Sequence, residues 1–503
     1  MTSLRHGGKV GEYVSSEPIA RTDSREEGEV LENTDHLHRR LGNRQIQLMA
    51  IGGTIGTALF VSIGGGLYKG GPGSLFLAYT IYACALGLVN NSIAELTTAY
   101  PVSGGFIRLA GHFVDDAFGV ILLNVLAIRV FGEAEFWLSG GKVLLIFIHD
   151  AYGFRNFKHN AFKEYRSTGS LGQFEGFCAA LWSASFCVTG PEYLSMVAGE
   201  ARRPRIYIKN AFKTVYWRFA LFFMGGALAV GIVLSSTDPT LTAIISGEKS
   251  GSGTAAASPY VIAMANMGIT GLPHLVSALL VTSIFSAGNT YTFCATRSLY
   301  GLAIEGRAPK ALRYCTKSGV PLVCFGIVMV FPCLAFLQVS NGSNVVLGWL
   351  INLVTAGGVI NYWVMCITYI FFYRACKAQG LDRNTLPYKG WFQPYSAYLG
   401  AAWMTMIVFC YGYTSFAPWS VSNFFIYYTL LLVAPVTYFG WKLIKRTRLL
   451  SPLEVDLVWE RPVIDNYEMT FIDPPQSFWS EMLGPLMFWR HSKGSDRQMS
   501  VSA

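Results

Sequence analysis

Three ionisable side chains stand in apolar surroundings. Glu95 lies near the end of a long apolar run, Lys142 lies in a shorter one, and Glu192 follows the apolar run that ends at Gly190 and Pro191. Charged groups inside a membrane are costly, and those that occur there tend to serve function. A carboxylate or lysine whose protonation changes readily could carry a proton. The alternative is that each charge reaches the membrane interface along its own side chain.

Two glycine-interrupted stretches could bind a molecule that carries both charges. They read IGGTIGTALF at residues 51–60 and SFCVTGPE at residues 185–192. Glycine and proline weaken a helix, and a break inside a membrane frees backbone groups that can bind a carboxylate and an ammonium. The alternatives are close helix packing by small residues in the first stretch and a simple kink in the second. One break early and one mid-chain is typical of transporter sites.

The elements that position these residues are apolar segments of membrane-spanning length. The chain has 503 residues, of which 52% are hydrophobic and 14% charged, against about 25% charged residues in soluble proteins. Its mean hydropathy is +0.37. A bilayer core needs about 20 apolar residues per helix. The expected segments are 46–67, 74–98, 174–198, 211–234, 272–295, 321–337, 345–373, 397–413 and 423–444.

Clusters of basic residues predict the topology. They lie at residues 38–44, 202–213, 307–317, 374–389 and 442–448, and the positive-inside rule places them in the cytoplasm. Residues 1–45 are then a disordered cytoplasmic tail and residues 46–444 a transmembrane domain. Residues 445–503 are a second cytoplasmic tail, which we expect to be disordered, although its aromatic residues could lie on the membrane surface. The sequon at Asn341 falls in a loop predicted to be outside.

Residues 104–148 do not fit this plan. The first two segments return the chain to the cytoplasm near Tyr100, and the segment at 174 must start outside, so an odd number of crossings lies between them. Three crossings need roughly 60 apolar residues. The 45 residues available carry seven charges, from Arg108 to Lys142. One crossing fits this length and three do not.

Other classes of function are disfavoured. The net charge of +9 comes from clusters beside apolar segments, so we expect no nucleic acid partner. The ten cysteines have no metal spacing, and we expect no metal and no cofactor. The sequence has no HExxH or GxSxG motif, so we do not expect an enzyme.

Four stretches together resemble the fungal amino-acid permeases, the yeast amino acid transporter family of the amino acid–polyamine–organocation superfamily. They are RLGNRQIQ at 40–47 running into the glycine-rich stretch, AEL at 94–96 with YPVSGGF at 100–106, SFCVTGPEYLSMVAGEARRPR at 185–205 and NTYTFCATRSLYGLAIEGRAPK at 289–310. The resemblance extends from residue 40 to about 445. It implies an all-α polytopic membrane protein in which two inverted five-helix repeats, with helices one and six unwound, surround a central site within a plan of twelve helices.

The resemblance also implies site residues. The substrate carboxylate would meet Gly56, Thr57 and Ala58. The amino group would meet Thr54 and the carbonyl groups of Ser185, Phe186, Cys187 and Val188, and Phe186 matches the aromatic residue that gates the site in relatives. Glu95, Lys142 and Glu192 match positions linked to proton coupling or pH response, and Lys142 stands where sodium-driven relatives bind an ion.

Two departures from the family pattern stand out. Ala58 replaces a glycine, and its Cβ would narrow the access of a carboxylate. Residues 104–148 correspond only to parts of helices three to five, so on the order of 50 residues are missing. About 10 to 11 helices are therefore expected instead of twelve.

The resemblance implies a permease that imports amino acids across the plasma membrane with protons. Its partners would be the amino acid, protons, membrane lipid, and trafficking or ubiquitin-ligase adaptors on the tails. The alternative is an amino-acid sensor or regulator that barely transports, or an inactive splice or gene-model variant of the same fold. The missing helices favour this alternative slightly.

Overall fold

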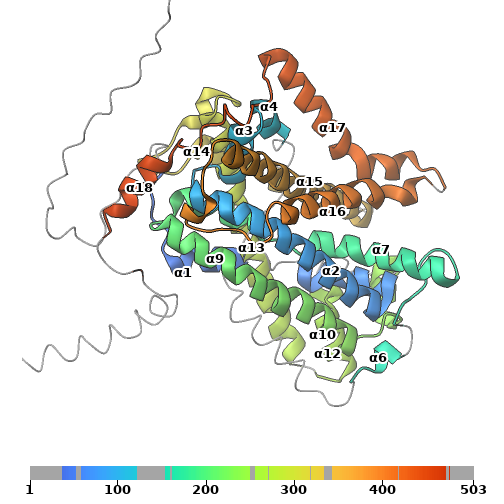
Figure 1. Cartoon of the computed structure of the whole chain (residues 1–503). Coiled ribbons are helices and arrows are strands. Elements are labelled where there is room, and N and C mark those ends of the chain that lie inside the picture. The colour runs from blue at the N-terminus through green and yellow to red at the C-terminus, as the bar shows by residue number, and fades with distance from the viewer. Residues whose placement is uncertain are drawn as a thin grey trace, which may run out of the picture.

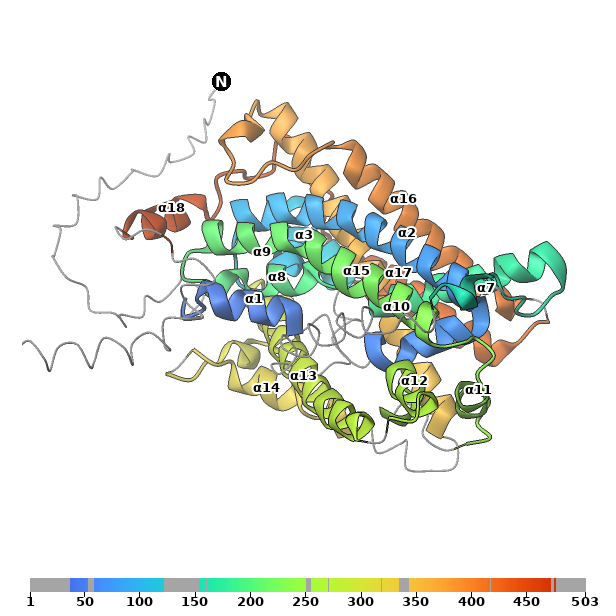
Figure 2. The ribbon, with the colours of Figure 1, turned by 90° about the horizontal axis from the view of Figure 1, so that it is seen from below.

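The computed structural model describes residues 37–52, 58–121, 153–158, 161–249, 255–269, 271–317, 319–333, 343–416, 418–471 and 475. Within these residues the regular structure is helical, apart from isolated bridges that join Leu41 to Ala201 and Phe416 to Trp419. The helices form a bundle in which α2, α9, α15 and α16 run alongside one another (Figure 1, Figure 2). The predicted all-α fold is confirmed.

The helices vary widely in length. The α-helices of the described residues are α1 (Asn43–Gly52), α2 (Ile63–Ala99), α3 (Gly105–Phe113), α4 (Asp116–Val120), α6 (Arg155–Lys158), α7 (Gly169–Cys187), α8 (Pro191–Val197), α9 (Pro204–Arg218), α10 (Gly225–Val233), α11 (Pro239–Ser246), α12 (Pro259–Asn266), α13 (Leu272–Ile304), α14 (Leu322–Val328), α15 (Ser343–Ala378), α16 (Tyr395–Cys410), α17 (Val421–Lys445) and α18 (Arg461–Met469). Two π-helical turns, η1 (Ala58–Ser62) and η4 (Phe219–Met224), precede α2 and α10.

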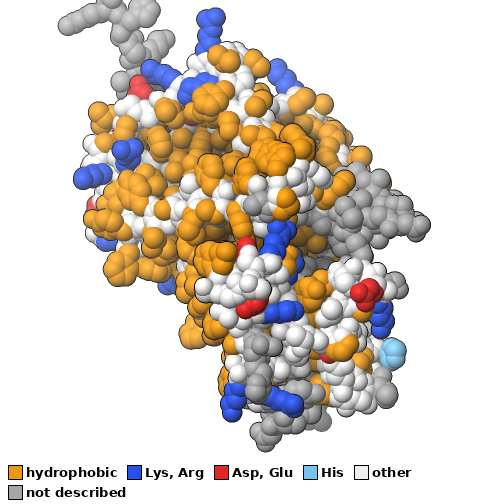
Figure 3. All heavy atoms as spheres, turned by 90° about the vertical axis from the view of Figure 1, so that its right-hand side faces the viewer, with side chains coloured by type: hydrophobic (Ala, Val, Ile, Leu, Met, Phe, Trp, Pro, Cys, Tyr) orange, Lys and Arg blue, Asp and Glu red, His pale blue; other side chains and the backbone are white. Residues whose placement is uncertain are grey.

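Four helical stretches of the described chain are long and apolar enough to cross a membrane. They are Ala58–Ala99, Pro204–Val233, Trp349–Ala378 and Val421–Lys445. The outer face of α17 is strongly apolar, since Val436, Phe439 and Leu443 are more than half exposed. Figure 3 shows hydrophobic side chains covering much of one face of the molecule. Such a surface is stable in lipid and not in water.

Helix α2 runs from the end of the first predicted segment, 46–67, through the second, 74–98. Its kink lies at Gly71, whose φ of 78° suits glycine, and Pro72 follows directly. Glycine adopts this conformation at little cost, and proline cannot donate the helical hydrogen bond. Helix α2 contacts α7, α9, α10, α15 and α16, and its Tyr79 and Tyr82 are fully buried. It is therefore the central element of the bundle.

The predicted break in the middle of the chain is present. Helix α7 ends at Cys187 and α8 begins at Pro191, so the predicted segment 174–198 is two helices. The backbone of Val188 is extended, with φ −86° and ψ 107°. Proline at the first position of α8 has no N–H to leave unpaired there.

A close crossing between the start of α3 and α13 depends on two glycines. A Cβ added to Gly104 would lie 2.8 Å from the Gly301 Cα, and one added to Gly301 would lie 2.7 Å from the Gly104 Cα. The start of α3 therefore crosses α13 with backbone against backbone. Of the predicted short region 104–148, the structure describes residues 104–121, which include α3 and α4.

The expectation of a disordered C-terminal tail is wrong for residues 446–471. This segment includes α18, which lies at one end of the bundle (Figure 1). The Tyr100 hydroxyl donates to the Leu457 carbonyl over 2.8 Å, and the Leu450 N–H donates to the Val114 carbonyl over 3.0 Å. The ring of Trp459 stacks on His112 with centroids 3.9 Å apart. These contacts join the C-terminal segment to Tyr100, at the end of α2, and to His112 of α3.

Candidate functional site

The break between α7 and α8 lies against the π-helical turn η1. The Cys187 thiol donates to the Ala58 carbonyl over 3.0 Å, and the Ser183 hydroxyl donates to the Ser62 carbonyl over 3.3 Å. The Tyr79 hydroxyl of α2 lies 3.3 Å from the Ser183 oxygen. The two glycine-interrupted stretches singled out in the sequence are therefore neighbours in space at their described ends.

Backbone carbonyl groups gather at the end of α7. The Val188 N–H donates to the Ala184 carbonyl over 2.8 Å and closes the last helical bond. The carbonyl groups from Ser185 to Val188 follow this bond, at the end of the helix where the regular i→i−4 pattern of hydrogen bonds stops. Such oxygens can accept from an ammonium group. Ser185 and Cys187 are buried, and the Phe186 side chain is partly buried against the core.

Glu192 belongs to a polar cluster directly after the break. Its Oε1 accepts from the Tyr362 hydroxyl of α15 over 2.8 Å, and its Oε2 accepts from the Gly190 N–H over 3.0 Å. The buried Tyr82 hydroxyl of α2 interacts with Ser185 and Glu192, but has no hydrogen bond of ordinary geometry among the described residues. A buried hydroxyl in this position has a free capacity to bind water or a ligand.

Glu95 has a different environment at the far end of α2. Its side chain is fully buried, and the Arg383 guanidinium donates to both oxygens over 2.7 Å. The Tyr369 hydroxyl and the Gly390 N–H also donate to Oε2, over 2.9 and 2.6 Å. Burial lowers the pKa of Arg383, but its hydrogen bonds to Glu95 outweigh burial and leave that pKa above the ordinary value. The carboxylate anchors the loop between α15 and α16 to α2.

A network of ion pairs joins two of the sequence motifs, and it was not among the sequence predictions. The Arg108 Nε donates to Glu305 over 2.6 Å, and its Nη2 donates to Glu460 over 3.0 Å. Arg307 pairs with Asp116 and with Glu305. A signal was available, because Arg108 and Glu305 flank the glycines of the SGGF and EGR stretches. These pairs tie α3, α4 and the end of α13 to the C-terminal segment.

Four of the predicted site residues lie outside the described residues. Thr54, Gly56 and Thr57 fall in the gap at 53–57, and Lys142 falls in the gap at 122–152. The structure brings Ala58, Ser185, Phe186, Cys187, Val188 and Glu192 together around the break, and it holds Glu95 apart from them, at the opposite end of α2 from η1.

The arrangement at the break suits the binding of a small polar molecule. It combines carbonyl oxygens, buried hydroxyl groups and one carboxylate, which together can hold a small cationic group. Within the part of the chain that the structure describes, no group of three or more His, Cys, Asp or Glu residues could hold a metal ion.

Comparisons with the sequences of known proteins agree on one family. A family model described as "Amino acid permease" matches residues 45–122 and 120–453. "General amino acid permease AGP2" of Saccharomyces cerevisiae is 39% identical over 501 residues, covering 86% of this chain and 84% of that protein. A proline-specific permease of Emericella nidulans is 32% identical over 506 residues, covering 88% and 91%. A solved structure, that of a manganese transporter of Eremococcus coleocola, aligns over 84% of this chain and 94% of its own, with a TM-score of 0.41 and 14% identity.

The same comparisons bear on the short region. The two pieces of the family match meet at residues 120–122, beside the last described residue before the gap, Ile121. The first alignment runs over 501 positions but covers only 86% of 503 residues. The relative therefore carries residues that have no counterpart in this chain.

Proposed function

This chain belongs to the amino acid permease family and is a multi-pass membrane protein of amino-acid transport, and we propose that it imports amino acids across the plasma membrane together with protons. Its relatives include a general, a proline-specific and a dicarboxylic amino acid permease. The substrates named for these relatives are all α-amino acids, and this is the substrate class that we propose.

The observation that carries the proposal is the break between α7 and α8 against η1. We place the substrate ammonium group at the carbonyls of Ser185, Phe186, Cys187 and Val188, and at Thr54. The substrate carboxylate then lies at Gly56, Thr57 and Ala58. The contact between Cys187 and the Ala58 carbonyl supports this placement, because it brings the two proposed halves of the site within one amino acid's reach.

Glu192 is the proposed proton carrier that the structure supports best. The Tyr362 hydroxyl can donate to an ionised carboxylate and accept from a protonated one, so this contact survives the uptake of a proton. Glu192 also lies four residues after Val188, the last of the residues whose carbonyl groups are proposed for the ammonium site. Glu95 and Lys142 remain proposed partners in coupling. At Glu95, proton uptake would cost hydrogen bonds from Arg383.

Uptake into proteoliposomes tests the proposal. We expect the full chain, reconstituted and supplied with a mixture of labelled amino acids, to accumulate label when the outside is acidic, and a protonophore to abolish accumulation. Glu192→Gln should abolish accumulation and still exchange internal for external amino acid. Glu248→Gln, on an exposed loop, is the matched control and should behave as the unmodified chain.

Two outcomes contradict the proposal in different ways. Accumulation that a protonophore leaves unchanged removes proton coupling and retains transport. Accumulation by Glu192→Gln at the rate of the unmodified chain removes Glu192 from the coupling step.

A sensor that binds amino acids without carrying them is the second candidate. It is favoured by the split family match at residues 120–122 and by the relatives' additional residues. Saturable binding of a labelled amino acid in detergent, with no flux in either direction in proteoliposomes, would support the sensor. Flux at the rate of a full-length family member would exclude it.

A further inference from the structure

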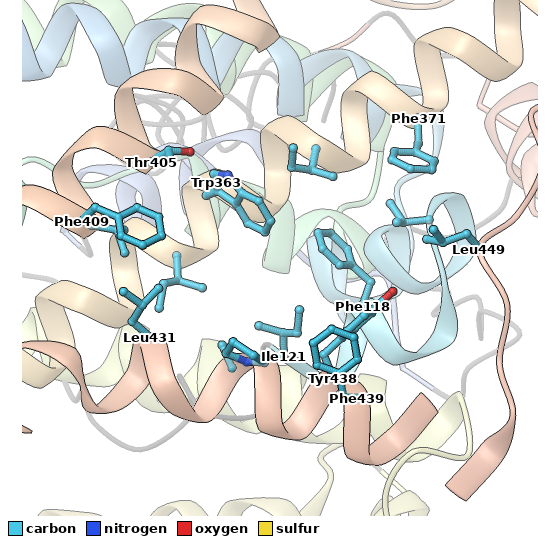
Figure 4. A pocket seen from close by; sticks show the side chains of 16 residues that line it. Phe118, Ile121, Trp363, Phe371, Thr405, Phe409, Leu431, Tyr438, Phe439 and Leu449 are labelled. Carbon is cyan, nitrogen blue, oxygen red and sulfur yellow. The ribbon is translucent and has the colours of Figure 1, made fainter. Parts of the chain in front are cut away.

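An apolar cavity lies away from the break, between α4, α15, α16 and α17. Its volume is about 480 Å³, which is within the range of ligand sites of roughly 300–1,000 Å³. Figure 4 shows Trp363, Phe118, Ile121 and Tyr438 around the space, with Phe409 and Leu431 towards one end and Phe371 and Leu449 towards the other. The lining is almost entirely apolar, and Thr405 is its one small polar side chain.

The cavity opens on the lipid-facing side of the bundle. Phe409 and Phe439 line it and are 60% and 59% exposed. Only 11% of the membrane-spanning window of α17 is buried inside the protein. Water in an apolar cavity makes few hydrogen bonds with the lining, and an empty cavity lowers the stability of the fold. A hydrocarbon chain from the surrounding membrane is the occupant that this lining suits.

The depth of the cavity matches one leaflet. On α15 it runs from Ile360 to Phe371, which is about 16 Å at the α-helical rise. This is close to half of a hydrocarbon core of about 30 Å. The end at Phe371 and Leu449 lies towards the C-termini of α15 and α17, where basic residues mark the cytoplasmic side.

Basic side chains lie near the end of the cavity at Phe371 and Leu449. Arg374 lies three residues beyond Phe371 on α15, and Lys445 and Arg446 end α17; all three are exposed. Lys442, one turn before Lys445, is held by Asp115 over 2.9 Å and by the Tyr438 hydroxyl over 3.1 Å. Basic groups at the cytoplasmic mouth of a cavity between membrane helices attract anionic lipid headgroups.

We propose that this cavity binds one acyl chain of an anionic glycerophospholipid of the cytoplasmic leaflet, with the headgroup phosphate held by Arg374, Lys445 and Arg446. The tail lies along Trp363 and Tyr438. The site is independent of the substrate site, since its lining residues include none from α7, α8 or η1.

Photolabelling of the full chain in phosphatidylcholine nanodiscs tests the site. The probes are phosphatidylserine and phosphatidylcholine that carry a diazirine on one acyl chain. We expect the phosphatidylserine probe to label peptides that contain Trp363 and Tyr438 more strongly than the phosphatidylcholine probe does. Removing a charge by Arg374→Gln or Lys445→Gln should reduce that preference by about fivefold each. Both residues are exposed, so these variants should fold.

Two substitutions on α17 separate the cavity from the general lipid surface. Ala434→Trp fills the cavity and should abolish labelling there. Val436→Trp, on the same helix at a position that is 71% exposed and outside the cavity, should leave labelling unchanged. Equal labelling by the two probes overturns the headgroup assignment. Labelling that survives Ala434→Trp overturns the tail site, and an unlabelled cavity in the unmodified chain means that the protein fills it itself.

Discussion

At the scale of single residues, two acidic side chains that look alike in sequence have different surroundings. Glu95 accepts four hydrogen bonds, two of them from the Arg383 guanidinium. Glu192 accepts from the Tyr362 hydroxyl and the Gly190 N–H, which are uncharged donors. The first arrangement fixes a loop, and the second tolerates a change of protonation. Burial in an apolar segment is therefore not enough to assign a role.

The ion pair of Glu95 gives a stability prediction. Glu95→Gln leaves the Arg383 guanidinium partly buried without its carboxylate, and breaking a buried pair in this way costs about 3–5 kcal/mol. We expect a clearly lower midpoint of thermal unfolding in detergent. Combining Glu95→Gln with Arg383→Gln should restore part of the loss, because no charge then remains unpaired. An unchanged midpoint for Glu95→Gln alone would mean that the pair does not support the fold.

At the scale of elements, close helix contacts decide which residues meet. Gly104 and Gly301 let the start of α3 touch α13, and this contact brings Arg108 within reach of Glu305. The break after Cys187 has a similar effect, because it turns the chain so that Glu192 faces Tyr362 of α15. In both places the position where a helix begins or ends decides which side chains meet.

Gly104→Ala tests the crossing of α3 and α13. The new Cβ would lie 2.8 Å from backbone of α13, and φ at this position is +79°, a conformation that costs a residue other than glycine about 1–2 kcal/mol. We expect a lower unfolding midpoint and weaker packing of α3. Gly440→Ala, where nothing lies within 4 Å of the added Cβ, is the control and should be neutral or slightly stabilising. Equal midpoints for the two variants would contradict the close crossing.

At the scale of the whole molecule, the C-terminal segment holds separate helices together. Glu460 pairs with Arg108 of α3, and Asp465 pairs with Arg205 of α9. The Gln379 side chain after α15 donates to the Pro452 and Val455 carbonyls over 3.0 and 2.7 Å. Residues 446–471 therefore connect α3, α9 and the end of α15 to one another.

Truncation tests whether residues 446–471 stabilise the bundle. A chain that ends at Arg448 loses the contacts of Tyr100 with Leu457, of Arg108 with Glu460 and of Gln379 with residues 452 and 455. We expect a lower unfolding midpoint and faster cleavage by trypsin after Arg108 and Arg205. A chain that ends at Phe471 keeps every contact named above and should match the full chain in both assays. If both truncated chains behave like the full chain, the segment adds no stability.

The sequence by itself determined the class of the protein, because apolar segments of bilayer length and basic clusters are local properties of the chain. It also located the break at residues 188–190, since glycine and proline act on the backbone where they stand. Only the tertiary structure decided the partners. The pairs Glu192 with Tyr362 and Glu95 with Arg383 join residues 170 and 288 positions apart, and nothing local specifies such distances. The order of residues 446–471 was missed for the same reason: a polar, aromatic segment is ordered only when the bundle supplies the groups that it binds.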